Sequence, residues 1–405
     1  MSAVAFPTIL VGFWAWGKAE AWHLSRYQYK PVPIPLQPNY KTQDVSLIVP
    51  SVGPDENFAE CLRSWLENRP GEIIIVTVDR YRKRVAGILE DAKRKLGPQF
   101  PGIQNVQLVV LPSDSLGVRK QFIEGVNKAK GSIIAKVDDH ILWPHPDFLQ
   151  HMLACFEDPE VGGVAPTCGL YMSEKRQNEE VVTPWEVAAA RSIWKGKARY
   201  LTAYAASNWI WVLPGMTVFY RSIILQNVDL QKTYLNEYWG GNGPMDAHED
   251  GALTRWAHQH DWKLCLQNAG PETEIRRTVK RDKAFLAQFF RWERGTIQSH
   301  RHLLRSVPQI WLRPWVAWKT LERTFRPVIT TIHIVAWIGS FVFYPRTSAL
   351  FILYYIICLA PSHAAFIAEH PYMWRHWWAA VLVDFFYIIQ DYYCCWTLSD
   401  VSFCL

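Results

Sequence analysis

The sequence has few of the features that mark disulfide-built, glycosylated or nucleic-acid-binding proteins. Its eight cysteines form no Cys-x-x-Cys pair in a chain of 405 residues. A chain this long does not need disulfides, so free thiols facing the cytosol are the simpler interpretation. No Asn-x-Ser/Thr glycosylation site is present, which suits a mainly cytosolic body. The sequence has no basic tail, and we therefore expect no nucleic-acid partner. It also has no internal repeat.

Hydrophobic residues and tryptophan, by contrast, are abundant. Hydrophobic residues make up 49% of the chain, which is enough to bury a large core. The 21 tryptophans exceed ordinary usage. Their broad rings, each with a single N–H, suit membrane interfaces and surfaces that stack on sugars. The net charge of +6 fits an anionic membrane surface or an anionic nucleotide equally well.

An apolar run near the N-terminus predicts a membrane anchor over residues 1–24. The run covers residues 3–16 and is closed by Lys18 and Glu20. No basic residue precedes the run, which argues against a cleaved signal peptide. Four prolines then predict an extended spacer over residues 25–43.

The C-terminal quarter predicts a membrane region. Three tryptophans share one helical face within residues 306–326, which indicates an interfacial helix. Three candidate spans follow within residues 327–405, namely 327–344, 348–368 and 377–398. Basic residues lie at those ends of the apolar segments that adjoin the preceding body, residues 44–305. The positive-inside rule therefore places that body in the cytosol, and we expect an integral protein of the plasma membrane.

The last candidate span, 377–398, is unusually polar. It contains Gln390 and two carboxylates, Asp384 and Asp391, which lie seven residues apart and so on one helical face. Carboxylates inside a membrane are costly unless they are paired or hydrated. Two interpretations stay open. The segment is either a polar conduit for sugar or a helix that lies partly in the interface without crossing.

Strands alternate with helices through the first part of the body. The pattern predicts strands at residues 45–49, 73–78, 106–111 and 133–137, with helices at 58–68, 82–96 and 118–130. Such alternation predicts an α/β fold with a doubly wound, largely parallel sheet. Ligands of such sheets bind at the carboxyl ends of the strands. Asp79 and Asp138 each follow a predicted strand, which singles them out from the other acidic residues.

Asp138, Asp139 and His140 close the predicted strand at residues 133–137. Side chains two residues apart leave a strand on the same side, so Asp138 and His140 converge. Oxygen ligands suit Mg²⁺ or Mn²⁺, and an imidazole shifts the preference toward Mn²⁺. Such a cation would neutralise the leaving charge of a nucleotide diphosphate. The alternative is a helix cap followed by a loop, with no metal.

His248, Glu249 and Asp250 open a predicted helix. Carboxylates at a helix start are favoured by the helix dipole, so a plain cap is one interpretation. The other is a general base, because inverting sugar transfer needs a carboxylate to take the proton of the acceptor hydroxyl. Glu249 and Asp250 point in different directions on a helix, so at most one of them can serve well.

A Gln-x-x-Arg-Trp motif at residues 288–292 follows on another predicted helix. Gln288, Arg291 and Trp292 are three and four residues apart and therefore share one face. Arginine suits a diphosphate leaving group, and tryptophan suits stacking on a sugar ring. The alternative is an ordinary basic helix at a membrane interface.

Together these residues resemble glycosyltransferase family 2, and within it the membrane-embedded polysaccharide synthases that make hyaluronan, chitin and cellulose. The resemblance covers most of residues 45–296 and rests on five matches in order, at 45–50, Asp79, 125–137, Asp250 and 288–292. It implies the α/β fold called GT-A. The family usually has Asp-x-Asp where this chain has Asp-Asp-His, a form that resembles a fungal group related to capsule or hyaluronan-type synthases.

The resemblance implies a role for each matching residue. It places Mn²⁺ or Mg²⁺ at the acidic cluster, Asp138, Asp139 and His140. The catalytic positions are Asp250 and its neighbour Glu249. The substrate-binding positions are Asp79, Arg119 or Lys120, Gln288, Arg291 and Trp292. Residues 213–216 resemble the acceptor-side turn that precedes the base.

The sequence therefore predicts an inverting membrane glycosyltransferase that adds sugar from a UDP-sugar to a growing polysaccharide of cell-wall or capsule type. A single-transfer enzyme with a glycolipid product, similar to ceramide glucosyltransferase, shares the Gln-x-x-Arg-Trp signature and is the first alternative. An inactive membrane scaffold is the second. The expected spans are few for a secretion channel, so a narrow pore, a homo-oligomer and no pore all stay open.

Overall fold

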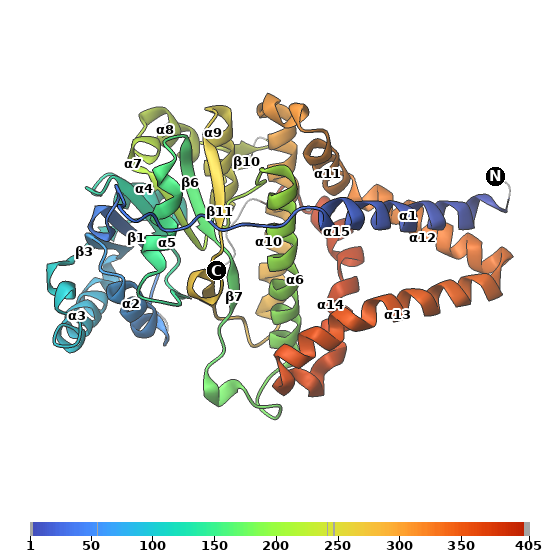
Figure 1. The fold of residues 1–405 in the computed structure, drawn as a ribbon, viewed down its shortest axis with the longest axis horizontal. Coiled ribbons are helices and arrows are strands. Elements are labelled where there is room, and N and C mark those ends of the chain that lie inside the picture. The colour runs from blue at the N-terminus through green and yellow to red at the C-terminus, as the bar shows by residue number, and fades with distance from the viewer. Residues whose placement is uncertain (1–2, 55, 241, 246–247, 401–405) are drawn as a thin grey trace.

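A seven-stranded mixed sheet forms the centre of the catalytic body (Figure 1). The computed structural model describes residues 3–54, 56–240, 242–245 and 248–400. The sheet has the order β11-β6-β8-β4-β1-β2-β3. Its strands are β1 (Val45–Ser51), β2 (Glu72–Val78), β3 (Gln107–Ser113), β4 (Ile133–Val137), β6 (Val161–Pro166), β8 (Thr217–Arg221) and β11 (Lys263–Gln267).

The predicted, largely parallel sheet is confirmed, with one antiparallel exception. β8 runs antiparallel to both of its neighbours, β4 and β6, whereas the other neighbouring pairs are parallel. All four predicted strands are present, and β4 has the predicted bounds. The sequence analysis did not foresee β8, which enters the sheet directly after the turn at residues 213–216.

Both faces of the sheet are covered, because successive residues of a strand point to opposite sides. On β1, Val45, Leu47 and Val49 face one hydrophobic core, and Ile48 faces the other. The first core is closed by α2 (Phe58–Glu67), α3 (Asp79–Leu96) and α5 (Phe148–Ala154). The second is closed by α4 (Val118–Val126), α7 (Ser222–Leu225), α8 (Val228–Leu235) and α9 (Glu249–Gln259).

A smaller three-stranded sheet lies beside the carboxyl end of β4. It consists of β5 (Ile141–Leu142), β7 (Cys168–Leu170) and β12 (Ile275–Arg277), with β12 in the middle. Arg277 of β12 pairs with Ile141, the residue that follows His140. A late segment of the chain is thereby brought next to the predicted metal motif. A separate hairpin joins β9 (Tyr238–Trp239) to β10 (Asn242–Pro244).

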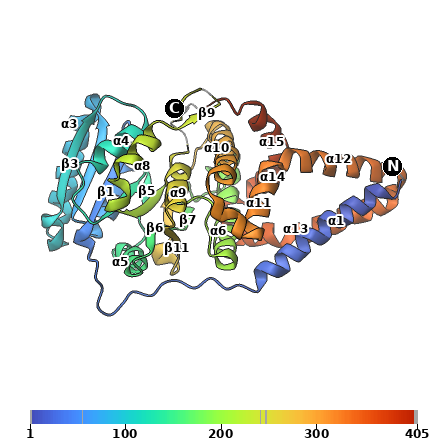
Figure 2. The same ribbon diagram turned by 90° about the horizontal axis from the view of Figure 1, so that it is seen from above.

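Two long helices, α6 (Pro184–Ser207) and α10 (Ala284–Ser306), run side by side between the sheet and the remaining helices (Figures 1 and 2). α6 begins with a capping box, in which Thr183 and Glu186 satisfy each other's backbone N–H. Ala188 and Ala189 of α6 pack against Phe285 of α10. α10 carries the Gln-x-x-Arg-Trp motif, so this contact helps to place the motif relative to the body.

Three helices project away from the body, namely α1 (Ala5–Ser25), α12 (Arg326–Phe343) and α13 (Pro345–Glu369) (Figures 1 and 2). Within the described residues, α12 and α13 are the two helices that are long and apolar enough to cross a membrane. α1 packs along α12 in the opposite direction. The Phe6 ring stacks on Phe343, and Trp16 contacts Trp318 of α11 (Pro314–Thr324).

The last predicted span differs from the continuous helix that we expected. The segment is divided at Phe386 into α14 (Trp377–Phe385) and α15 (Tyr387–Trp396), of nine and ten residues. Asp384 forms an ion pair with Arg191 of α6 at 2.9 Å, and Asp391 pairs with Arg326 of α12. The two carboxylates therefore attach the C-terminal helices to the body, as buried charges require partners.

Candidate active site

A buried lysine that the sequence analysis did not single out organises the end of β4. Lys136 is about 1% exposed, and its Nζ donates to Asp138 Oδ1 at 2.8 Å, Gly215 O at 2.8 Å and Glu249 Oε1 at 3.0 Å. Burial opposes the charge, but Asp138 and Glu249 outweigh it and raise the pKa of Lys136. The signal in the sequence is a lysine inside the otherwise apolar strand at residues 133–137.

The turn at residues 213–216 is where the predicted clusters meet. Gly215 N–H donates to Asp250 Oδ2 at 3.3 Å, and Asp138 N–H donates to Met216 O at 2.9 Å. A Cβ at Gly215 would lie 2.8 Å from Asp250 Cβ, so glycine is needed for this close approach. Arg277 Nη1 donates to Met216 Sδ at 3.3 Å on the other side of the turn.

Glu249 and Asp250, the first residues of α9, point to different partners, as expected for neighbours on a helix. Burial raises the pKa of Glu249. The positive charges of Lys136 and Arg291 lower the pKa by more, and the result is about 2. Burial raises the pKa of Asp250, and the negative charge of Glu249 adds to that rise against the opposing effect of His248. Glu249 is thus the ion-pair partner of Lys136, whereas Asp250, with its raised pKa, is the stronger base.

The acidic cluster fits a cation that is shared with a phosphate. The side chains of Asp138 and His140 are 29% and 32% exposed at the end of β4. Asp139 accepts from Ser51 Oγ at 2.6 Å and lies 3.2 Å from His140 Nδ1, which orients the imidazole. In the described part of the chain no three His, Cys, Asp or Glu side chains are grouped for a metal. Two donors suffice for Mg²⁺ or Mn²⁺ when a diphosphate and water supply the other ligands.

The Gln-x-x-Arg-Trp motif reaches the same region from α10. The Arg277 guanidinium lies 4.5 Å from the centre of the Trp292 ring. Arg291 is close enough to Glu249 to lower the pKa of that carboxylate. Gln288 lies one turn earlier on α10 and is half-buried. The three sequence clusters are thus linked through Lys136, the turn at 213–216 and Arg277.

Of the remaining predicted residues, Arg119 reaches the start of α9, where its Nη2 donates to His248 O at 3.5 Å. Arg119 is buried and donates to Tyr234 O at 2.8 Å and to Glu237 Oε2 at 2.9 Å, so it supports the segment before α9. Lys120 is exposed on α4. Asp79 is exposed in the first turn of α3, at the carboxyl edge of β2. Of the two basic candidates, Lys120 is therefore the one at the surface.

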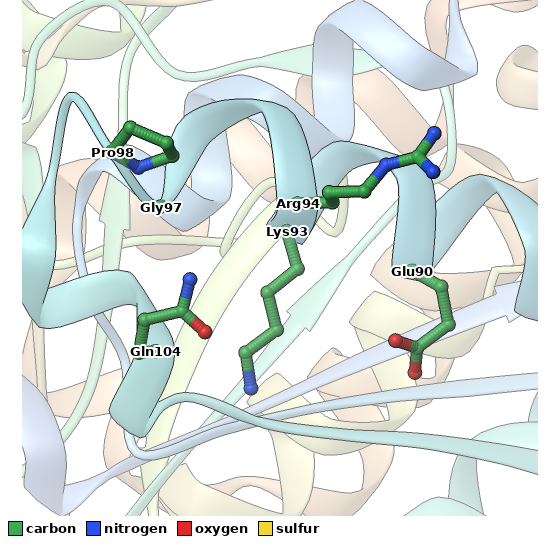
Figure 3. A pocket seen from close by; sticks show the side chains of 6 residues that line it. All are labelled: Glu90, Lys93, Arg94, Gly97, Pro98 and Gln104. Carbon is green, nitrogen blue, oxygen red and sulfur yellow. The ribbon is translucent and has the colours of Figure 1, made fainter.

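Two open cavities lie away from these clusters. One of about 660 Å³ lies beside α3, at the β3 edge of the sheet, and is lined by Glu90, Lys93, Arg94, Gly97, Pro98 and Gln104 (Figure 3). The other, of about 410 Å³, includes Arg276 and Tyr372. Arg276 is next to Arg277 on β12 and so points to the opposite face of the small sheet. Neither cavity contains a predicted catalytic residue.

The fold and these clusters define a class of protein, a nucleotide-sugar glycosyltransferase with a GT-A-type fold. Residues 42–295 match the family described as glycosyltransferase like family 2, and the chain belongs to that family. The predicted family and enzyme class are thereby confirmed. The family match covers the body that bears all three clusters and ends within α10.

Similar proteins support this assignment. The chain is 31% identical to the NDP-glycosyltransferase ltbB of Aspergillus luteorubrus over 400 residues, which is 96% of this chain and 95% of the relative. It is 27% identical to a type 2 glycosyltransferase of Zymoseptoria tritici over 83% of this chain and 68% of the relative. Among solved structures, the mannosyltransferase PcManGT of Pyrobaculum calidifontis has a similar fold, with a TM-score of 0.57 and 16% identity over 96% of this chain and 99% of that chain.

Proposed function

We propose that the protein is an inverting glycosyltransferase that moves a sugar from a UDP-sugar to an acceptor hydroxyl at the cytosolic face of a membrane. The observation that carries the proposal is the position of Asp250. Its carboxylate lies against the turn at 213–216, and the same turn holds Asp138 through a backbone hydrogen bond. A base and a carboxylate that would hold the cation of the diphosphate, both on one turn, suit in-line displacement at an anomeric carbon.

In the proposed reaction, Asp250 takes the proton of the acceptor hydroxyl while the acceptor oxygen bonds to the anomeric carbon. The bond from that carbon to the diphosphate breaks, and UDP leaves with the electron pair. Glu249 cannot share the role, because it is ion-paired to Lys136 and has a pKa of about 2. Arg291 supplies positive charge toward the leaving diphosphate, and Trp292 offers an aromatic surface on which a sugar ring can stack.

A divalent cation is part of the proposal. Asp138 and His140 would hold Mn²⁺ or Mg²⁺, which would neutralise charge on the leaving diphosphate. PcManGT, the solved protein of similar fold, was determined in complex with GDP-Man and Mn²⁺, which supports a cation of this kind. The chain's own contribution is to hold Asp138 through Lys136 Nζ at 2.8 Å and to orient His140 through Asp139.

The acceptor is either a growing polysaccharide, as the resemblance to synthases implies, or a lipid. We propose a lipid and a single transfer. α12 and α13 leave large apolar side chains exposed, among them Val342 and Leu350. Helices of this kind would hold the protein against a membrane, where a lipid-borne hydroxyl is available as the acceptor.

Asp250→Asn tests the proposed base. Membranes containing the protein are given UDP-glucose, UDP-N-acetylglucosamine or UDP-glucuronate with Mn²⁺, and transfer is measured. With the donor that gives turnover, we expect the variant to lose transfer by about 10²- to 10⁴-fold, because that is what a general base contributes. Binding of UDP should be unchanged. Asp229→Asn, which changes an exposed carboxylate of α8, is the matched control.

Turnover of Asp250→Asn within a few-fold of the wild type would show that another group acts as the base. If the wild-type protein itself transfers no sugar from any of these donors, the inactive scaffold becomes the better description.

A further inference from the structure

His248, the residue before α9, has a backbone conformation that is unusual for its type. Its φ is +61°, in the left-handed region, which a residue other than glycine adopts at a cost. The side chain makes no capping hydrogen bond to the first turn of α9. The usual reason for a polar residue at a helix start therefore does not explain it. The strained residue lies two positions before the proposed base.

Two glycines make room for the His248 ring. A Cβ at Gly251 of α9 would lie 2.7 Å from His248 Cδ2, and a Cβ at Gly295 of α10 would lie 2.9 Å from His248 Cγ. The ring is thus held between the two helices and is 14% exposed. Packing this tight restricts the ring to one orientation.

In that orientation one ring nitrogen faces Asp250. His248 Nδ1 lies 3.3 Å from Asp250 Oδ1, which also accepts from Gly251 N–H at 2.8 Å. His248 Nε2 is buried and has no hydrogen-bond partner among the described residues. A ring with its proton on Nδ1 can donate to Asp250 Oδ1 in this geometry.

The two oxygens of Asp250 are therefore unequal. Oδ1 faces two donors, Gly251 N–H and His248 Nδ1, whereas Oδ2 faces one, Gly215 N–H at 3.3 Å. A carboxylate oxygen has two lone-pair sites. Oδ2 keeps one of them for a proton, on the side of the turn that also holds Asp138.

We infer that His248 is a positioning residue, which donates from Nδ1 to Asp250 Oδ1 and so directs Oδ2 toward the acceptor hydroxyl. The inference rests on the proposed role of Asp250 as the base. His248 itself forms no bond to substrate and exchanges no proton in the reaction. Its contribution belongs to catalysis after binding, because the carboxylate must be aligned only when the hydroxyl attacks.

Three substitutions of His248 distinguish a requirement for the hydrogen-bond donor from a requirement for the left-handed backbone conformation. His248→Asn accepts the left-handed conformation readily and places an amide N–H near the position of Nδ1. His248→Gly accepts the conformation but has no donor. His248→Gln has its amide at the position of Nε2, facing away from Asp250. The kcat and the KM for the UDP-sugar that gives turnover are measured for each, together with thermal unfolding and UDP binding.

We expect His248→Asn to keep kcat within about threefold of the wild type. His248→Gly and His248→Gln should lose about tenfold or more in kcat with little change in KM, as expected for the loss of a hydrogen bond to a charged group. Equal kcat for the Asn and Gly variants would overturn the inference, since the conformation alone would then be the requirement. Equal losses in kcat for all three, with normal unfolding and UDP binding, would overturn it as well.

Asp250→Asn, measured beside these variants, keeps the two proposals distinguishable. If Asp250→Asn stays active, the proposed base is wrong. If Asp250→Asn is inactive but the Asn and Gly variants of His248 match each other, only the positioning role fails.

Discussion

At the scale of single residues, the centre of the site is a buried cation. Lys136 lies between Asp138 of the predicted metal motif and Glu249 beside the predicted base, so one side chain couples two segments more than 100 residues apart. Removing one partner of a buried ion pair leaves the others uncompensated, which costs about 3–5 kcal/mol. Lys136 is therefore required for stability as well as for the geometry of the site.

Lys136→Met should lower the free energy of unfolding by about 3 kcal/mol and abolish transfer. The pH dependence should change too. In the wild type, the pKa of Glu249 is about 2, below its usual value. As the pH falls from about 4 toward 2, the unfolded chain takes up the proton first and stability falls. Lys136→Met removes the main cause of the lowered pKa, so this acid-side loss of stability should shrink.

Thermal unfolding in detergent across this pH range measures both effects, with Lys128→Met, an exposed lysine, as the control. An unfolding profile for Lys136→Met that matches the control would contradict the role of Lys136.

At the scale of elements, α10 connects the catalytic motif to the peripheral helices. Trp292 faces Arg277 of the small sheet, and the next residue, Glu293, pairs with Arg323 of α11 and with Arg326 Nη2 of α12 at 3.2 Å. Gln390 of α15 donates to Phe289 O at 3.0 Å. The motif is therefore held from both sides, and α10 cannot shift without breaking buried ion pairs.

Two glycine-to-alanine substitutions test the packing of α10. Alanine normally stabilises the interior of a helix relative to glycine by about 1 kcal/mol. Gly87→Ala in α3, where nothing lies within 4 Å of the added Cβ, should raise the free energy of unfolding by about that amount. Gly295→Ala should instead lower both stability and kcat, because its Cβ would displace the His248 ring. Thermal unfolding and transfer assays measure both variants. A stabilised, fully active Gly295→Ala would contradict the tight packing of the His248 ring against Gly295.

At the scale of the whole molecule, the chain has a polar catalytic body and an apolar projection. Large side chains of the projection are more than half exposed, among them Val342 of α12 and Leu350 and Ile357 of α13. Exposed apolar surface of this extent marks a membrane or partner contact. Four basic residues lie just before α11, within it and at the start of α12, namely Arg313, Lys319, Arg323 and Arg326.

The size of the product distinguishes the two acceptor classes. With membranes and a labelled UDP-sugar, a single transfer to lipid should give label that extracts into organic solvent and migrates as one small species. Repeated transfer should give label in water-soluble or insoluble material of high mass. The proposed single transfer to a lipid predicts the first result. High-mass product from purified, reconstituted protein would favour the synthase interpretation.

The sequence by itself determined the first four strands, the family and the short motifs, because hydrophobic periodicity and local spacing are properties of neighbouring residues. β4 and the start of α9 fall where the pattern places them. Only the tertiary structure decided which groups meet. The antiparallel β8, the contact of Lys136 with Glu249, and the burial of Asp384 and Asp391 against Arg191 and Arg326 all join distant segments. The sequence alone leaves both a conduit and an interfacial helix open for this segment. The folded chain supplies the partners of its carboxylates, since a buried carboxylate is stable only beside a cation.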